Sequence, residues 1–412
     1  MNDLHFSTRI IGADYEKPDA HGALSLPVYR NAAFEFADSE SIAAAFRGET
    51  GEHTYSRISN PSVAHFERKI LAASGAASVI ALSSGMAAIT NTFFAIAAAG
   101  NNIVASPHLF GNTFAFFNST LAFFGVEVRW VDAADLQQIA EAVDENTCAF
   151  FVELITNPHM EIADLPAISN ILKSKGVPLI VDTTLVPWCA FDARRFGVDI
   201  EVVSTTKYIS GGATGTGGVI VDHGTFDWTK NRKLAAMPEP PAVSRFTAKL
   251  RGEIVRNLGG YMTPDTAWQQ SLGMDTLGVR FQRMSATAHA LARHFENHPK
   301  VVRMGYTALE SSPYKSLSDA FFTGDPGAMF TMELASQDDC FRFMDALKLF
   351  RRATNLFDNR SLVIHPFSTI YCTFTPQMKR TAGITDNLIR FSAGLEEVED
   401  LKRDIENALK LL

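Results

Sequence analysis

A single lysine, Lys207, stands between a short apolar run and a run of glycines. The β-branched pair at 202–203 predicts a buried strand, and the glycines within 211–218 predict a backbone that a ligand can approach closely. Burial at a strand end lowers the pKa of an amine, and a neutral amine can form a Schiff base with an aldehyde. The hydroxyl groups of Ser204 and Thr206 could bind a phosphate beside it. An exposed lysine on a turn is the alternative that this stretch leaves open.

An aspartate lies 25 residues before this lysine (207 − 182), at the end of another apolar run, 179–182. A strand–helix–strand passage of that length would bring Asp182 and Lys207 to one edge of a parallel sheet. A carboxylate beside a pyridine nitrogen keeps the ring protonated, and a protonated ring acts as an electron sink. The alternative for Asp182 is a turn residue that bonds its own backbone.

Two further stretches could bind an anion. The run Ser83-Ser84-Gly85 joins a strand-like segment to an alanine-rich helix, and the N–H groups at a helix start attract phosphate. Helix capping by a serine is the alternative. The polar loop 53–61 carries Tyr55 and Arg57, and a guanidinium matches phosphate oxygens bidentately. An exposed linker is the alternative there.

Phe110 could stack on a ring or serve as a core aromatic.

The elements that must position these residues form an alternating pattern. Apolar strand-like runs alternate with helical segments between residues 80 and 221, which predicts a largely parallel sheet covered on both faces. Ligands bind such sheets at the carboxyl ends of the strands. Helices are expected over 39–46, 112–124 and 275–298, and strands over 329–334 and 389–392. We therefore expect an N-terminal arm (1–60), a large domain (61–250) and a smaller C-terminal α/β domain (251–412).

Composition narrows the class of protein. The chain has 412 residues, a net charge of −8 and no basic run, which gives no support for nucleic-acid binding. It contains no apolar stretch of about 18 residues, so no membrane span is expected. Its four cysteines are far apart and match neither a metal-binding nor a disulfide pattern. We expect a cytoplasmic protein without a metal.

Four motifs occur in a fixed order: Ser-Ser-Gly-Met at 83–86, Thr-Asn-Pro at 156–158, Val-Asp-Thr-Thr at 181–184 and Ser-Thr-Thr-Lys-Tyr at 204–208. Further matches lie at 55–61, 257–260, 361–366 and 389–396. Together they resemble the Cys/Met metabolism enzymes that use pyridoxal phosphate, over nearly the whole chain. The resemblance implies fold type I, with a mostly parallel seven-stranded sheet in a large domain and a smaller C-terminal α/β domain.

The resemblance also implies roles for individual residues. Lys207 would be the catalytic residue and bind the cofactor aldehyde. The cofactor would be bound by Tyr55, Arg57, Gly85, Met86, Phe110, Asn157, Asp182, Ser204, Thr206 and Lys207, and the substrate by Tyr55, Asn355 and Arg390. Tyr55 and Arg57 would reach the site of a neighbouring subunit, so the resemblance implies a homo-oligomer, a tetramer of active dimers. Since the family usually has a tyrosine where Phe110 stands, Lys207 would carry more of the proton transfer.

The segment 355–369 looks most like O-acetylhomoserine sulfhydrylases. Arg360 stands where cystathionine-handling members carry a glutamate, and Asn112 stands where methionine γ-lyases carry a cysteine. The resemblance therefore implies γ-replacement, forming homocysteine from an O-acyl homoserine, namely O-acetylhomoserine, and a sulfur donor. Methionine γ-lyase or cystathionine γ-synthase activity is the alternative within the family. A non-catalytic binding protein is the alternative from another class, and the intact Lys207 and Asp182 count against it.

Overall fold

The first half of the chain builds a seven-stranded sheet in the computed structural model, which describes residues 4–13, 19, 21–240 and 242–412. The strand order is β1-β7-β6-β5-β4-β2-β3, and only β7 runs antiparallel to its neighbours. This confirms the expected mostly parallel sheet. The strands are β1 (Ser78–Leu82), β2 (Asn102–Ala105), β3 (Glu127–Trp130), β4 (Thr147–Glu153), β5 (Leu179–Asp182), β6 (Ile200–Val203) and β7 (Gly218–Asp222).

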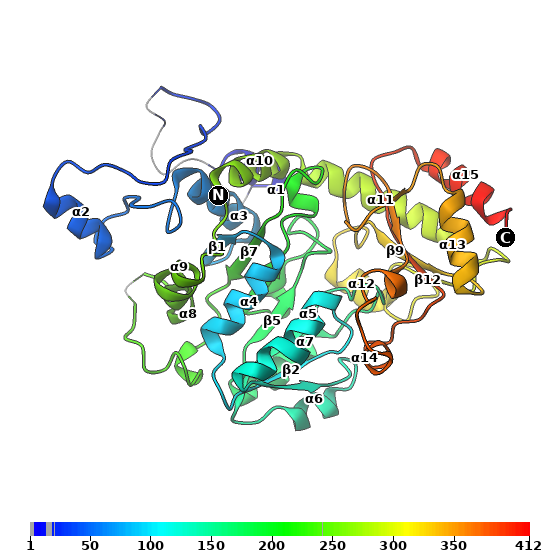
Figure 1. Cartoon of the computed structure of the whole chain (residues 1–412), viewed down its shortest axis with the longest axis horizontal. Helices are drawn as coiled ribbons and strands as arrows, with labels where there is room; N and C mark the ends of the chain where they lie inside the picture. Colours follow the sequence, from blue (N-terminus) through cyan, green and yellow to red (C-terminus); the bar gives the residue numbers. More distant parts are fainter. Residues whose placement is uncertain (1–3, 14–18, 20, 241) are drawn as a thin grey trace.

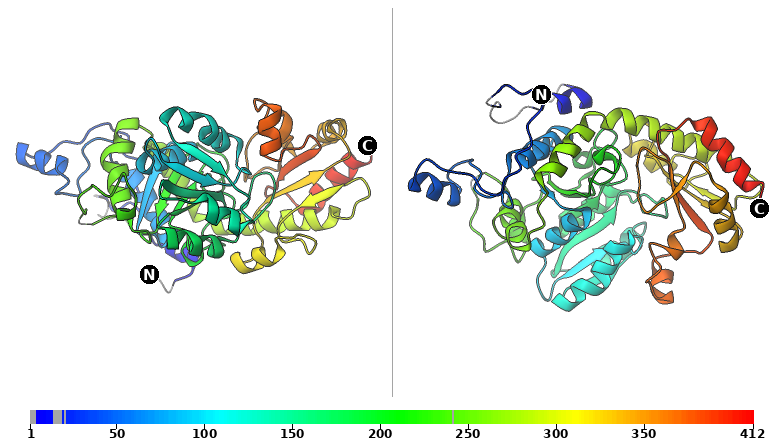
Figure 2. Two further views of the ribbon diagram at one scale, coloured as in Figure 1. Left: turned by 90° about the horizontal axis from the view of Figure 1, so that it is seen from below. Right: turned by 45° about the horizontal axis from the view of Figure 1, so that its top comes forward.

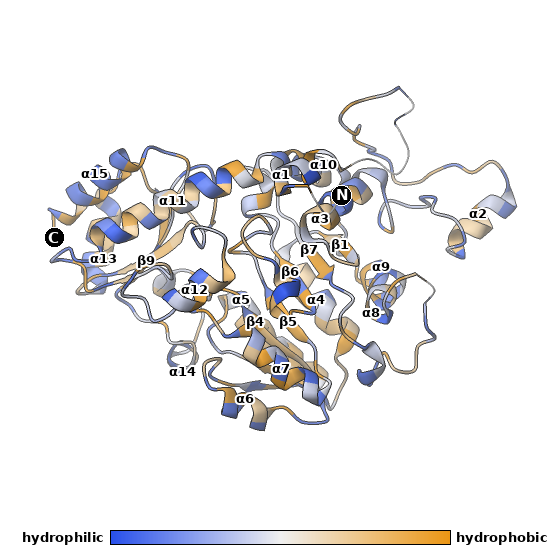
Figure 3. Ribbon diagram, turned by 180° about the vertical axis from the view of Figure 1, so that it is seen from behind, coloured by the Kyte–Doolittle hydropathy of each residue, from blue (hydrophilic) through white to orange (hydrophobic). Residues whose placement is uncertain are grey.

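Helices cover both faces of this sheet because its strands are apolar on both sides (Figures 1 and 3). One face packs against α3 (Pro61–Ser74), α6 (Leu136–Ala142) and α7 (Leu165–Lys175). The other packs against α4 (Gly85–Ile96), α5 (Gly111–Ala115), α8 (Arg245–Lys249) and α9 (Val255–Leu258). The carboxyl ends of β1, β4, β5 and β6 consequently meet at one edge, between the two helical layers.

A five-stranded sheet forms the second half, in the order β10-β11-β12-β9-β8. It is mixed, since β10 and β11 are parallel and the other pairs are antiparallel. Its strands are β8 (Arg303–Gly305), β9 (Met329–Glu333), β10 (Arg351–Arg352), β11 (Leu362–Ile364) and β12 (Leu388–Ser392). The accompanying helices are α11 (Leu277–Phe295), α12 (Lys315–Phe321), α13 (Gln337–Ala346), α14 (Pro376–Thr381) and α15 (Val398–Leu409), whereas α10 (Pro264–Asp275) packs against α3 of the large half. The long helix α11 runs from the large sheet to the small one (Figure 1).

Two expected helices differ from the structure. Residues 112–124 are not one helix, because α5 continues as a π-helical turn (Phe116–Thr120) and a 3-10 turn (Leu121–Phe124). Phe114, in the regular part, stacks on Trp130, whereas Phe123, in the 3-10 turn, is exposed. The passage from β5 to β6 holds only a 3-10 turn (Ala193–Phe196) instead of a full helix. By contrast, the helix expected over 39–46 is confirmed as α2 (Ser39–Phe46).

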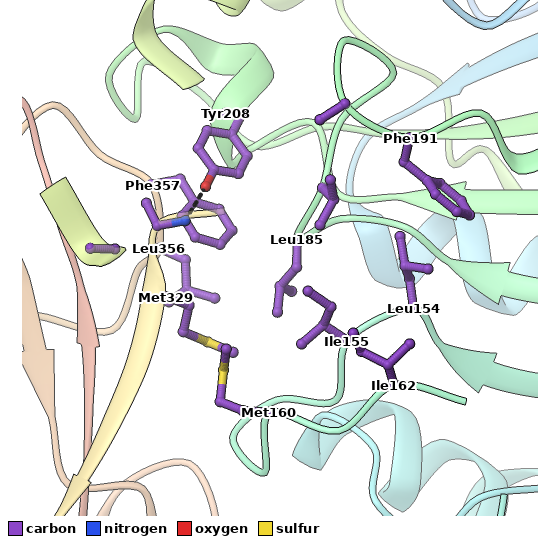
Figure 4. Close-up of a cluster of buried hydrophobic side chains, with 14 of the residues drawn as sticks. Leu154, Ile155, Met160, Ile162, Leu185, Phe191, Tyr208, Met329, Leu356 and Phe357 are labelled. Atoms are coloured by element: carbon purple, nitrogen blue, oxygen red, sulfur yellow. Dashed lines mark hydrogen bonds between the residues drawn. The ribbon is translucent and has the colours of Figure 1, made fainter. Parts of the chain in front are cut away.

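An apolar cluster joins the two halves beside the lysine loop (Figure 4). The ring of Tyr208 stacks on that of Phe357, with centroids 3.9 Å apart. The Ala328 N–H donates to the Tyr208 hydroxyl oxygen at 2.7 Å. Because Tyr208 directly follows Lys207, these contacts with the second half fix the position of the Lys207 backbone.

The N-terminal segment leaves the body of the protein. Helix α1 (Phe6–Ile11) lies against the large half, whereas the segment carrying α2 projects away from it (Figures 1 and 2). Among the described helices, none has the length and apolar character needed to cross a membrane.

Candidate active site

A cavity of about 510 Å³ opens at the carboxyl edge of the large sheet and is closed on its other side by the small half. Its lining includes residues that follow β1, β4, β5 and β6, together with Asn355 and Arg390 from the second half. Of the residues predicted from the sequence, Gly85, Met86, Phe110, Asn157, Asp182, Ser204, Thr206, Lys207, Asn355 and Arg390 line this cavity. Pockets of this size hold small organic ligands.

Lys207 lies four residues beyond the end of β6 and points its amine into the cavity. Its Nζ donates to Asn355 Oδ1 at 2.9 Å. The pKa of Lys207 is lowered to about 8, chiefly by burial and also by the nearby Arg390 guanidinium, while Asp182 acts in the opposite direction. The structure therefore gives Lys207 the weakly basic amine that carbonyl chemistry requires.

Asp182 and Glu153 end neighbouring strands and lie opposite each other in the register of β4 and β5. Burial raises the pKa of Asp182, although the Thr184 N–H donates to its Oδ1 at 2.9 Å. Burial also raises the pKa of Glu153, and the charge of Asp182 adds to that effect. Two carboxyl groups this close favour a positively charged partner in the cavity.

The start of helix α4 forms an anion cradle. Ser84 Oγ accepts the Ala87 N–H at 3.0 Å, so this serine does cap the helix, while the N–H groups of Gly85 and Met86 begin its first turn. Such N–H groups have no partner inside the helix. A Cβ at Gly85 would lie 2.7 Å from Ser204 Cβ, so glycine is needed for the close packing. Thr206 Oγ1 accepts the Gly217 N–H at 3.0 Å, which fixes the second hydroxyl nearby.

Arg390 lies on β12 and is 3% exposed. Its Nη1 donates to Asn157 Oδ1 at 3.2 Å and its Nη2 to the Asn355 carbonyl at 3.3 Å. Its Nε is buried without a hydrogen-bond partner among the described residues. Burial lowers the pKa of Arg390 to about 10. A buried guanidinium that bonds only neutral groups is a receptor for an anionic ligand.

Tyr55 and Arg57 do not line the cavity of their own chain. Tyr55 is 42% exposed, and the Arg57 guanidinium lies 5.6 Å from the centre of its ring. Arg57 also donates to the Arg256 carbonyl. Both residues lie between α2, on the projecting segment, and α3 of the large half.

The cavity is also lined by residues that were not predicted from the sequence, above all Glu153, Thr184 and Ile370. One signal was available for Glu153, because a lone acidic residue ends the otherwise apolar strand β4. Nothing in the sequence marks Ile370, which reaches the cavity from a loop of the second half. Arg360 and Asn112, which suggested the subgroup, do not line the cavity; Arg360 pairs with Asp358 at 2.8 Å.

The cavity residues fit pyridoxal phosphate. The unpartnered Arg390 Nε and the cradle in which Gly85 leaves no room for a Cβ both point to anionic groups on a ligand. Lys207 offers an amine to an aldehyde, and Asp182 offers a carboxylate to a ring nitrogen. The helix start, Ser204 and Thr206 offer donors to a phosphate.

Comparison with known proteins supports the same conclusion. The family model of the Cys/Met metabolism PLP-dependent enzymes matches residues 7–410, and the chain belongs to this family. It is therefore a pyridoxal-phosphate-dependent enzyme of fold type I, as the sequence predicted.

Named relatives narrow the class further. The chain is 33% identical to an O-acetyl-L-homoserine sulfhydrylase from Corynebacterium glutamicum, over 97% of this chain and 96% of that protein. It is 34% identical to an L-methionine gamma-lyase from Pseudomonas putida, over 98% and 97% of the two chains. An O-acetylhomoserine sulfhydrylase of the methionine biosynthetic pathway of Wolinella succinogenes is 41% identical, with a TM-score of 0.77, over 86% of this chain and 99% of that one.

A putative O-acetylhomoserine (thiol)-lyase from Campylobacter jejuni matches the fold with a TM-score of 0.92 and 30% identity, over 99% of this chain and 100% of that one. That structure carries N'-pyridoxyl-lysine-5'-monophosphate at position 205 of its own chain.

Proposed function

We propose that the protein is an O-acetylhomoserine sulfhydrylase, which forms homocysteine and acetate from O-acetylhomoserine and a sulfide source. The observation that carries the proposal is the placement of the buried Arg390 beside Lys207, with Asn355 bonded to both. An amino acid bound through its carboxylate to Arg390 would present its α-carbon to the lysine amine. The sulfhydrylases from Corynebacterium glutamicum and Wolinella succinogenes support this choice within the family.

The chain's own residues bind and orient the reactants. Arg390 binds the α-carboxylate of the substrate, and Asn355 Oδ1 accepts a hydrogen bond from the Lys207 amine whenever that amine is free. Because burial lowers the pKa of Lys207, its amine loses its proton more readily than that of an exposed lysine, and the neutral amine can take a proton from the α-carbon. Bound pyridoxal phosphate supplies the electron sink for the charge that develops there. Asp182 would stabilise the protonated ring nitrogen.

The cofactor phosphate would bind at the start of α4. The N–H groups of Gly85 and Met86 and the hydroxyls of Ser204 and Thr206 are its ligands in this proposal. Phe110 would stack on the ring, and Asn157 would contact the ring hydroxyl. With a phenylalanine at 110, no phenol is available at that face, so Lys207 transfers protons at both the α- and β-carbons.

The projecting arm supports a homo-oligomer, in which Tyr55 and Arg57 complete the phosphate site of a neighbouring subunit and Tyr55 also contacts the substrate. This proposal explains why both residues lie outside their own cavity. We further propose a tetramer of active dimers, a cytoplasmic location, and the division into arm (1–60), large domain (61–250) and small domain (251–412).

Methionine γ-lyase activity is the second candidate, because the Pseudomonas putida relative is equally similar in identity. Two assays separate the candidates: homocysteine formation from O-acetylhomoserine plus sulfide, and ketobutyrate release from methionine. We expect the first reaction to be faster, and a faster second reaction would refute the sulfhydrylase assignment.

Lys207→Ala tests the cofactor assignment. The wild-type protein is expected to show visible absorbance from lysine-bound pyridoxal phosphate, and the variant is expected to lose it together with activity. Lys233→Ala is the control, since Lys233 bonds the carbonyls of Phe94 and Ala97 away from the cavity. Identical visible spectra of Lys207→Ala and the wild type would show that the cofactor is bound elsewhere.

A further inference from the structure

Glu153 is a buried carboxyl group that the chemistry above does not use. It ends β4, is 3% exposed and lines the cavity beside Asp182. One carboxyl oxygen accepts the Phe110 N–H at 2.5 Å, and the other accepts the Asn157 N–H at 2.9 Å. A single side chain thus connects the loop after β2 with the loop after β4.

Tyr371 makes the complementary contacts from the second half of the chain. It is 1% exposed, and its hydroxyl lies 3.2 Å from the Leu109 carbonyl oxygen and 3.1 Å from the Asn157 carbonyl oxygen. The peptide unit between Leu109 and Phe110 therefore meets the Tyr371 hydroxyl at its oxygen and Glu153 at its N–H, and the single hydroxyl proton is shared between the Leu109 and Asn157 carbonyls. Asn157 is held in the same way, through its own carbonyl and its own N–H.

The two loops held in this way carry the residues assigned to the cofactor ring. Phe110 and Asn157 both line the cavity, and Asn157 in turn bonds Arg390 at 3.2 Å. Tyr371 also packs closely against the loop after β2, because a Cβ at Gly111 would lie 3.3 Å from Tyr371 Cε1. Movement of either loop would therefore shift both the contacts of Phe110 and Asn157 with the cofactor ring and the position of Arg390.

We propose that Glu153 and Tyr371 form a positioning pair that fixes Phe110 and Asn157 relative to each other, and so determines how tightly the cofactor ring is held. The inference rests on the proposed function, because the roles of Phe110 and Asn157 belong to it. The pair acts through these two residues and takes no part in bond making.

The test uses Glu153→Gln, Tyr371→Phe and the double variant. Glu153→Gln replaces one of the two accepting oxygens with a donating NH2 group, and Tyr371→Phe removes the hydroxyl, so each change loosens one side of the same two loops. We expect each to raise the dissociation constant for pyridoxal phosphate by about tenfold or more, measured by titrating cofactor-free protein. The visible circular dichroism of bound cofactor should change in both. In the double variant, the fold increase in the dissociation constant should be smaller than the product of the two single increases, because either change alone already releases the loops.

Asp199→Asn is the matched control. Asp199 is a buried carboxyl group at the opposite end of the same sheet, where it accepts the Leu179 N–H at 2.9 Å. This change is expected to lower the free energy of unfolding and to leave the cofactor dissociation constant unchanged. Unfolding in urea is measured for every variant without cofactor.

Two results would overturn the inference. If Glu153→Gln and Tyr371→Phe behave like Asp199→Asn, the pair has only a structural role. If their effects on cofactor binding multiply, the two residues act independently. Should Glu153→Gln fail to fold, Tyr371→Phe decides alone, since it removes a single hydroxyl. Failure of the wild type to bind pyridoxal phosphate would refute the proposed function instead of the pair.

Discussion

Removing the active-site lysine should make the cofactor-free protein more stable at neutral pH. Lys207 has a pKa of about 8 in the folded protein, below its ordinary value of 10.5, chiefly because of burial. At about 1.4 kcal/mol for each tenfold change, this difference corresponds to about 3 kcal/mol against folding when the amine is charged. Partial exposure at the cavity mouth and the unpaired Asn355 left behind reduce the net gain of Lys207→Met to about 1–2 kcal/mol.

The pH dependence has a defined sign. Between about pH 8 and 10.5 the unfolded chain binds the lysine proton and the folded protein does not. The free energy of unfolding contributed by this group therefore rises with pH across that window. The advantage of Lys207→Met should be complete below pH 8 and disappear above about 10.5.

Urea unfolding of cofactor-free wild type and Lys207→Met, at equal protein concentration and at several pH values, measures this difference. Lys300→Met is the control, because it removes a bond to the Leu409 carbonyl at 2.9 Å and is expected to destabilise the protein. A Lys207→Met protein that is less stable than wild type at pH 7, by the same amount as at high pH, would refute the reasoning.

Three further changes test the site. Arg390→Lys keeps a charge but loses the planar fork, so kcat/KM for O-acetylhomoserine should fall by about tenfold to a hundredfold while the cofactor stays bound; unchanged kinetics would contradict the carboxylate role. Asn355→Ala frees the Lys207 amine and should lower kcat by about tenfold; a changed KM alone would contradict this. Gly85→Ala places a Cβ 2.7 Å from Ser204 Cβ and should weaken cofactor binding in a titration, with free inorganic phosphate as competitor.

The elements that sequence patterns predicted best are those with a clear period and a clear cap. Helix α11 shows the expected amphipathic spacing, and α2 begins where Asp38 accepts the Ser41 N–H. The single helix expected over residues 112–124 is wrong, because the regular helix ends at Ala115 and a π-helical and a 3-10 turn follow. Local pattern cannot reveal such turns.

The sequence by itself determined the chemistry of the chain. Lys207 after an apolar run, Asp182 ending another and the Ser-Ser-Gly turn before a helix are local signals, because strand ends, turns and helix starts are encoded by neighbouring residues. They predicted the parallel sheet and singled out the lysine, and the order of the motifs at 83–86, 156–158, 181–184 and 204–208 added the cofactor through resemblance to a known family.

Only the tertiary structure decided how these residues meet. Arg390 reaches Asn157 across 233 residues, and Tyr371 reaches Asn157 across 214. The pairing of Glu153 with Asp182 depends on the register of two strands. The contacts of Arg390 and Tyr371 arise when the two halves pack together, and burial there lowers the pKa of Lys207 and leaves Arg390 without an ion-pair partner among the described residues. No spacing along the chain encodes that burial. The sequence therefore identified Lys207 as a candidate active-site residue but did not predict the side chains that surround it.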